Sequence, residues 1–185
     1  MAVEEPPFQT VIRAGAFEVR DYPALIVAEV TVTGSRRAAA SKGFRLLAGY
    51  IFVGNTRRQR VAMTAPVGQI PASEKIAMTA PVAQIADAGA WTVRFTMPHS
   101  YTLAALPVPT DPKVRLRQLN PTRFAVLRFS GLAGTSDVAT KTAELRAAIA
   151  TRGLPVAGPV TLAQYDPPWT LWFMRRNELM IPVGR

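Results

Sequence analysis

The sequence contains no cysteine and only one histidine, and both shortages restrict the chemistry that the chain can perform. Without cysteine there are no disulfides, no thiolate metal sites and no cysteine nucleophiles. The single histidine, His99, lies in a proline-containing segment without a carboxylate close by in sequence. It cannot supply the paired ligands of a zinc site or an obvious catalytic triad. The sequence therefore predicts no catalytic residues and no metal site built from protein ligands alone.

Long apolar runs are also missing, although 49% of the residues are hydrophobic. No window approaches the roughly 18 uninterrupted apolar residues of a membrane span, and residues 1–7 lack a basic region followed by an apolar one. We therefore expect a cytoplasmic protein, or a periplasmic one if a signal peptide has been removed. The 185 residues are enough for a single domain, 1–185, around one core.

Acidic residues are scarce, with 12 against 22 basic ones and a net charge of +10. Such a surplus favours anionic partners, which include nucleic acid, acidic lipid and small molecules that carry carboxylates. The basic residues are scattered in twos and threes without a long basic run, so we expect a solvated surface and no nucleic-acid partner. Binding driven by charge alone remains an alternative, and it would weaken steeply with salt.

The hydrophobic pattern predicts two similar halves, at about residues 10–100 and 111–185. Strands are expected at 17–22, 25–33, 60–67, 75–82 and 91–97, and again at 114–119, 124–130, 160–165, 170–173 and 178–183, with helices at 36–50 and 137–152. Each half is thus a strand-strand-helix-strand-strand unit, which buries too little surface alone. We expect an α+β fold in which the two units share one curled antiparallel sheet and both helices pack on it.

Two apolar features suggest a cleft. Residues 61–70 and 76–85 are near-duplicates, and each contains a methionine, Met63 or Met78, that either fills a gap in the core or lines a site for a flat ligand. Trp169 and Trp172 follow two prolines near the end of the chain, where they could form a stacking wall for a ligand ring.

The motifs occur together in one family. The matching segments are Phe17-Glu18-Val19-Arg20-Asp21-Tyr22, Gly43-Phe44-Arg45-Leu46-Leu47 with Tyr50-Ile51, Gly54-Asn55, Ala62-Met63-Thr64-Ala65-Pro66-Val67, Leu106-Pro107 with Pro109 and Asp111, Tyr165-Asp166-Pro167-Pro168 and Arg175-Arg176-Asn177-Glu178. In this fixed order the chain resembles the SOUL heme-binding proteins along nearly its whole length. The resemblance implies a distorted antiparallel β-barrel flanked by two helices. It also implies non-enzymatic binding of heme or a related tetrapyrrole in an apolar groove, as a carrier, buffer or scavenger, and we expect a monomer.

Mapped onto this chain, the groove would lie between the first helix and the loops near the C-terminus. Its expected residues are Phe44, Leu47, Tyr50, Ile51, Met63, Met78, Trp169 and Trp172. Arg57, Arg58 and Arg60 are expected to bind the heme propionates, because guanidinium groups suit carboxylates. The iron ligand stays open among His99, Met63 and Met78, and binding without iron ligation would extend to metal-free porphyrin.

A second hypothesis is a small-ligand hydrolase or effector-binding domain, because the duplicated unit is similar to the effector-binding fold of drug-sensing regulators. An enzyme of this kind would need a carboxylate with a raised pKa inside the cleft. The candidates are Glu18, Glu29 and Glu178.

Overall fold

The structure is a computed structural model that describes residues 4–52, 54–57, 61, 65–71, 89–166 and 169–184. These residues form nine strands, two α-helices and one short 3₁₀ helix, which confirms the expected α+β class. In chain order they are β1 (Gln9–Ala14), β2 (Phe17–Tyr22), β3 (Leu25–Thr33), α1 (Arg36–Phe52), β4 (Val67–Pro71), β5 (Ala90–Thr96), β6 (Arg115–Leu119), β7 (Thr122–Ser130), α2 (Thr135–Thr151), β8 (Thr161–Gln164), η1 (Trp172–Met174) and β9 (Arg176–Pro182).

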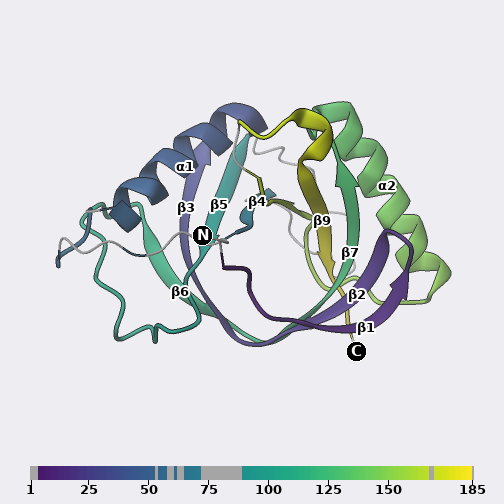
Figure 1. Cartoon of the computed structure of the whole chain (residues 1–185), viewed down its shortest axis with the longest axis horizontal. Coiled ribbons are helices and arrows are strands. Elements are labelled where there is room, and N and C mark those ends of the chain that lie inside the picture. Colours follow the sequence, from purple (N-terminus) through teal and green to yellow (C-terminus); the bar gives the residue numbers. More distant parts are fainter. Residues whose placement is uncertain are drawn as a thin grey trace, which may run out of the picture.

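All nine strands belong to one antiparallel sheet that curls into a half-barrel (Figure 1). Their order is β1-β2-β7-β9-β8-β4-β5-β3-β6. Without β1, the sheet is symmetric about the neighbouring strands β8 and β4. Reading outward from these two, β8, β9, β7 and β2 on one side match β4, β5, β3 and β6 on the other, because each matched pair has the same place in the two units. The first strand of each unit therefore pairs with the other unit, β2 with β7 and β6 with β3. The two halves are joined at these strands and at the β4–β8 ladder.

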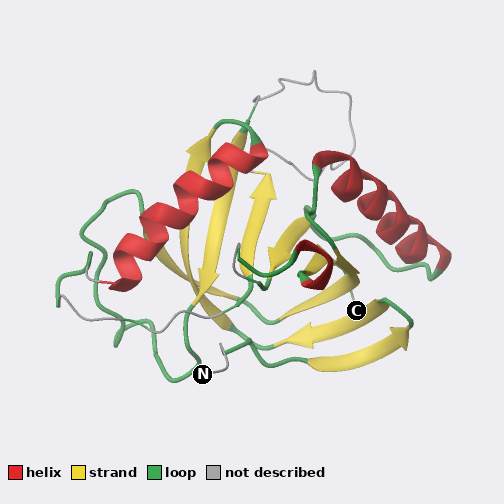
Figure 2. Cartoon of the chain, turned by 45° about the horizontal axis from the view of Figure 1, so that its top comes forward, coloured by secondary structure: helices red, strands yellow, loops and turns green. Residues whose placement is uncertain are grey.

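Each helix packs on the half of the sheet that belongs to its own unit, α1 on β3 and β5 and α2 on β7 and β9. Figures 1 and 2 show one helix beside each half of the curled sheet. Strand alternation sends Val30, Val93 and Phe95 toward α1, and Leu127 and Leu179 toward α2. We call the opposite side of the sheet, the inside of the curl, the inner face.

Close packing of α1 on the sheet depends on Gly43. A Cβ atom at this position would lie 2.5 Å from Cγ2 of Val93, so only glycine fits the present spacing. Gly49, six residues later in the same helix, has no atom within 4 Å of such a Cβ position. The two glycines of α1 therefore experience opposite surroundings.

Three expectations about strands differ from the structure. The strand expected at 60–67 differs from the structure at its described residues, because Val61, Ala65 and Pro66 are not in a strand and β4 begins only at Val67, after Pro66, which has no N–H to donate to a ladder. Residues 60 and 62–64 lie outside the described residues. The strand expected at 170–173 is replaced by η1, and β1 was not expected at all. The strand expected at 75–82 lies outside the described residues. Neither described helix has the length and apolar character that a membrane-spanning helix requires.

Candidate functional site

The inner face contains a buried carboxylate, Glu178 of β9, which is fully inaccessible to solvent. Arg20 of β2 donates from Nη1 and Nη2 to the two carboxylate oxygens, over 2.8 and 3.1 Å. The hydroxyl of Tyr165 donates to Oε2 at 2.7 Å. Arg176 also donates to Oε1. The carboxylate is thus held by two guanidinium groups and a phenol.

These partners determine the protonation of the cluster. Burial alone would raise the pKa of Glu178, but the hydrogen bonds from Arg20 and Tyr165 outweigh burial and hold the pKa below its ordinary value of 4.5. Burial, together with the negative charge of Glu178, raises the pKa of Tyr165 well above its ordinary value of 10.0. At neutral pH Glu178 is therefore an ion and Tyr165 a neutral donor.

A second ion pair lies on the inner face of the other unit. Glu29 of β3 accepts from Nε of Arg94 at 2.7 Å and from Nη1 of Arg117 at 3.1 Å. Burial alone would raise the pKa of Glu29, but hydrogen bonding to Arg94, followed by Arg117, lowers it below 4.5. Glu29 and Glu178 are consequently both ionised and paired.

Two cavities lie along the inner face and its rim. One, of about 110 Å³, is bordered by Glu4, Pro6, Leu25 and His99. The other, of about 100 Å³, extends along the inner face between Tyr22, Ile70 and Met180, and shares Pro6, Leu25 and Thr96 with the first. Pockets that enclose drug-sized ligands measure about 300–1,000 Å³. Neither of these two cavities of the described residues can therefore enclose a macrocycle.

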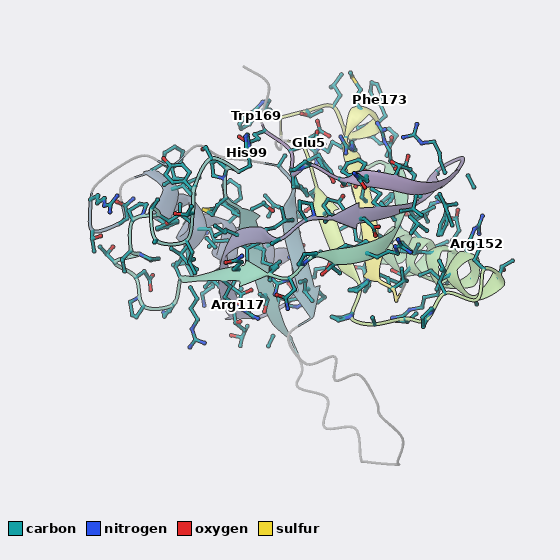
Figure 3. All side chains as sticks on the ribbon, turned by 90° about the horizontal axis from the view of Figure 1, so that it is seen from below. Glu5, His99, Arg117, Arg152, Trp169 and Phe173 are labelled. Carbon is teal, nitrogen blue, oxygen red and sulfur yellow. The ribbon has the colours of Figure 1, made fainter. Side chains whose placement is uncertain are left out.

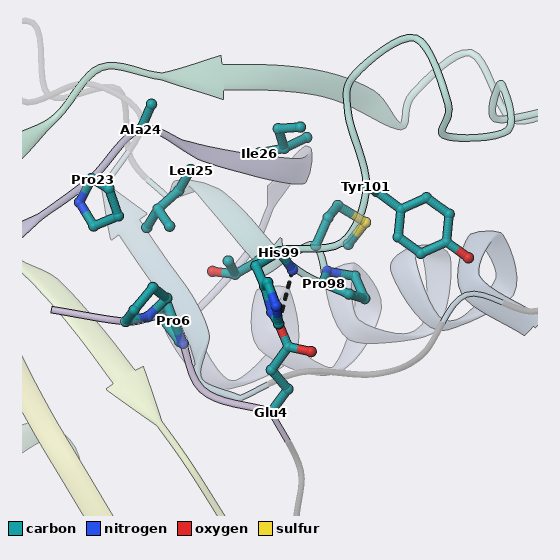
Figure 4. Close-up of a pocket in the computed structure, with 12 residues that line it drawn as sticks. Glu4, Pro6, Pro23, Ala24, Leu25, Ile26, Pro98, His99 and Tyr101 are labelled. Carbon is teal, nitrogen blue, oxygen red and sulfur yellow. Dashed lines mark hydrogen bonds and ion pairs between the residues drawn. The ribbon is translucent and has the colours of Figure 1, made fainter.

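His99 lies at the rim of the first cavity and faces Glu4 (Figure 4). Its Nδ1 lies 2.6 Å from Oε1 of Glu4, and the same oxygen accepts the backbone N–H of His99 at 2.8 Å. The backbone and side-chain hydrogen bonds from His99 lower the pKa of Glu4 below 4.5. Because the carboxylate occupies Nδ1 of a side chain that is 74% exposed, Nε2 is the ring nitrogen left to meet a ligand.

A run of large apolar side chains is exposed at the same end of the molecule. We call it the apolar ridge, and it consists of Trp169, Leu171, Trp172, Phe173 and Met174, with 54 to 83% of each residue exposed. Asp166 and Arg176, on either side of the ridge, are joined by a hydrogen bond, and Arg176 in turn pairs with Glu5, next to Glu4. Figure 3 shows Trp169 and Phe173 on the same side as Glu5 and His99. Exposed apolar patches of this kind mark binding surfaces.

Comparison with known families identifies the chain. The sequence model described as SOUL heme-binding protein matches residues 3–182, almost the entire chain. The chain belongs to the SOUL family. No curated protein matches it.

Solved structures share the SOUL chain's fold at low sequence identity. The EcmrR C-terminal domain has a TM-score of 0.67 at 9% identity and covers 96% of this chain and 98% of its own. A hydrolase from Listeria innocua has a TM-score of 0.61 at 17% identity, with 94% of both chains covered. SAV2435 bound to tetraphenylphosphonium has a TM-score of 0.51 at 13% identity, covering 91% of this chain and 93% of its own. At these identities the similarity establishes the fold alone.

The helix residues that the SOUL resemblance assigned to the groove separate into two groups. Leu47, Tyr50 and Ile51 are at most 2% exposed and belong to the core beneath α1. Tyr50 donates its hydroxyl to the carbonyl of Pro107, and burial raises its pKa to about 12. Phe44 is 40% exposed and stacks edge-on against Phe95. Of the four, Phe44 is the one that a surface ligand could contact.

Arg57 is exposed after the end of α1 and donates from Nη1 to the carbonyl of Ala105. Four further residues of the expected SOUL groove lie outside the described residues, namely Met63, Met78, Arg58 and Arg60. The structure therefore brings Trp169 and Trp172 together on the ridge, places His99 at the same end, and leaves these four assignments as predictions.

Sequence reasoning missed most of this arrangement. Leu171 and Phe173 of the ridge fall in the strand predicted at 170–173, because tryptophan, phenylalanine and threonine favour strands, and no sequence pattern singled out Met174. Glu4, the partner of His99, is 95 residues away in sequence, so no local pattern could have paired them. Arg20 could have been recognised, because the alternation of β2 puts it on the same face as Glu18 and Tyr22.

Proposed function

We propose that this SOUL protein binds heme or a related tetrapyrrole reversibly on the apolar ridge, as a carrier, buffer or scavenger without chemistry of its own. The observation that carries the proposal is the exposure of five large apolar side chains within six consecutive residues. Flat aromatic side chains stack on the face of a macrocycle and remove apolar surface from water. An open surface also suits a ligand that neither cavity can enclose.

Charged groups would hold the edge of the macrocycle. Arginine forks bind carboxylates with paired hydrogen bonds, and we propose Arg57, with Arg58 and Arg60, as partners of the propionates. Arg57 is exposed, as this role requires. Apolar contact supplies most of the affinity, so the binding should change little with salt, unlike binding driven by charge alone.

His99 fits the chemistry of an iron ligand. A metal-binding imidazole usually donates its second ring nitrogen to a carboxylate, which fixes the tautomer, and Glu4 provides that carboxylate at 2.6 Å. A bound heme would supply iron with an open coordination position. We propose His99 as the first candidate for that position, with Met63 and Met78 as the alternatives.

Titration of the purified protein with hemin and with metal-free protoporphyrin tests the proposal. Saturable binding of both, followed by absorbance and by tryptophan quenching, is expected if the ridge supplies most of the affinity. His99→Ala should then weaken hemin and leave protoporphyrin unchanged if His99 is the iron ligand. Failure of both compounds to bind saturably would overturn the proposed function.

The structure supplies an argument against the rival hydrolase. A general acid or base at neutral pH needs a carboxylate with a raised pKa, whereas the pKa values of Glu29 and Glu178 are lowered. Glu18 is paired with Arg13 and Arg20. The similarity to a protein named as a hydrolase concerns the fold, and a shared fold does not carry a reaction with it.

A further inference from the structure

The cavity of about 100 Å³ on the inner face is a separate feature from the ridge. Its walls are mostly apolar and come from strands of both units. They include Tyr22, Leu25, Val27, Ile70, Leu119, Phe124 and Met180. Gly68 and Ala163, which face each other in the β4–β8 ladder, provide its floor. The two small residues leave the space that a larger pair would fill.

The size of the cavity limits its occupant. An apolar cavity of about 150 Å³ accepts a benzene molecule, and this cavity of about 100 Å³ is smaller but open to solvent on one side. The space therefore fits a single aromatic ring with one edge toward solvent. It is too small for a fused ring system.

Charge determines what the ring should carry. Arg94 lines the cavity. Arg94 and Arg117 each donate one of their five N–H groups to the carboxylate of Glu29. Arg115 is directly opposite Glu29 in the β3–β6 ladder and thus on the same face. Two guanidinium groups hydrogen-bond to this one carboxylate and Arg115 extends from the same face, so this edge of the sheet carries net positive charge, and of the three arginines it is Arg94 that lines the cavity.

The opposite side of the cavity adds no net charge. Tyr22 and Tyr165 line it, and burial raises the pKa of both hydroxyl groups, so they are neutral. Glu178 lies behind them, fully buried and paired with Arg20. The field inside the cavity is therefore set by the arginines near Glu29.

We propose that the inner-face cavity binds small aromatic carboxylates. The ring lies among Ile70, Phe124 and Met180, and the carboxylate accepts hydrogen bonds from Arg94 and Arg117. This site uses other residues than those proposed for the tetrapyrrole, although its cavity adjoins the one that His99 borders.

A titration with 3-phenylpropionate, followed by NMR of protein labelled at the methionine methyl groups, tests the site. Met180 lines the cavity, whereas Met174 lies on the ridge, so the two methyl signals separate the two surfaces. The expected result is a saturable shift of the Met180 signal and no shift of the Met174 signal. The neutral amide of the same compound should bind about tenfold more weakly, because it lacks the charge-assisted hydrogen bonds.

Two variants locate the ligand. Arg117→Gln removes one guanidinium group and should weaken the binding of 3-phenylpropionate about tenfold. Arg45→Gln changes an exposed residue of α1, away from the cavity, and should have no effect. Gly68→Val should block the cavity, and its Cβ fits because the nearest atoms are 3.5 and 3.8 Å away. All three variants should still bind hemin if the ridge is the tetrapyrrole surface.

Three results would overturn this site: absence of saturable binding, a shift of Met174 without Met180, or unchanged affinity in Arg117→Gln. Equal binding of the amide would contradict the role of charge. Hemin binding is recorded in the same samples, so a failure here is distinguishable from a failure of the tetrapyrrole proposal.

Discussion

At the scale of single residues, Glu178 has the largest expected effect on stability. It is fully buried, and its charge is compensated by Arg20 and Arg176. Removing one partner of a buried ion pair costs about 3–5 kcal/mol, because the other charge stays buried. Glu178→Gln should therefore lower the free energy of unfolding by about 3 kcal/mol or more, measured by urea denaturation at pH 7.

The exposed pair of Lys141 and Glu144 on α2 provides the matched control. Glu144→Gln makes the same chemical change at the surface and should cost at most about 0.5 kcal/mol. Equal losses in the two variants would show that burial of Glu178 contributes nothing to the stability of the protein.

The lowered pKa of Glu178 also predicts how stability depends on pH. A carboxylate whose pKa is lower in the folded state than in the unfolded state stabilises the folded protein at pH values above its unfolded-state pKa. This contribution disappears as the pH falls through the folded-state pKa. The stability difference between the wild-type protein and Glu178→Gln should therefore be constant near neutrality and shrink below pH 4.5. Urea denaturation of both proteins at several pH values measures it. A difference that grows toward acid would contradict the ion pair.

At the scale of the elements, the two glycines of α1 separate helix propensity from packing. Gly49→Ala adds a methyl group in open space and should stabilise the protein by about 0.5–1 kcal/mol. Gly43→Ala brings the same methyl group against Val93 and should destabilise by about 1–3 kcal/mol through overpacking. Thermal unfolding of both variants measures the two effects. If both stabilise, α1 does not pack on β5 as closely as described.

Sequence patterns predicted the elements that bury one clear face. Alternation placed β2 and β3 at their observed bounds, and α1 was two residues longer than expected. β1 was missed because all six of its residues are exposed, so it has no apolar periodicity. Residues 170–173, which include three residues of the ridge, were predicted as a strand because residues that favour strands occur there without a partner strand.

At the scale of the whole molecule, the fold brings together residues that no local pattern connects. The N-terminal Glu4 reaches His99, and Glu5 reaches Arg176. The sequence motifs predicted membership of the SOUL family, which the family comparison confirms. The exposure of Trp169 and Trp172 agrees with their expected place at a ligand surface. The burial of Leu47, Tyr50 and Ile51 could not be predicted. Apolar residues of α1 lie both in the core and at the surface, and the sequence does not distinguish the two groups.

The central claim is that the apolar ridge is the tetrapyrrole surface, and the hemin affinity of a double variant tests it most directly. Trp169→Ala with Trp172→Ala removes both indole rings and should weaken hemin binding by about tenfold or more, judged by absorbance. Val11→Ala with Ile12→Ala removes exposed apolar groups from β1 and should leave the affinity unchanged. Wild-type affinity in the tryptophan variant, or an equal loss in the β1 variant, would contradict the account.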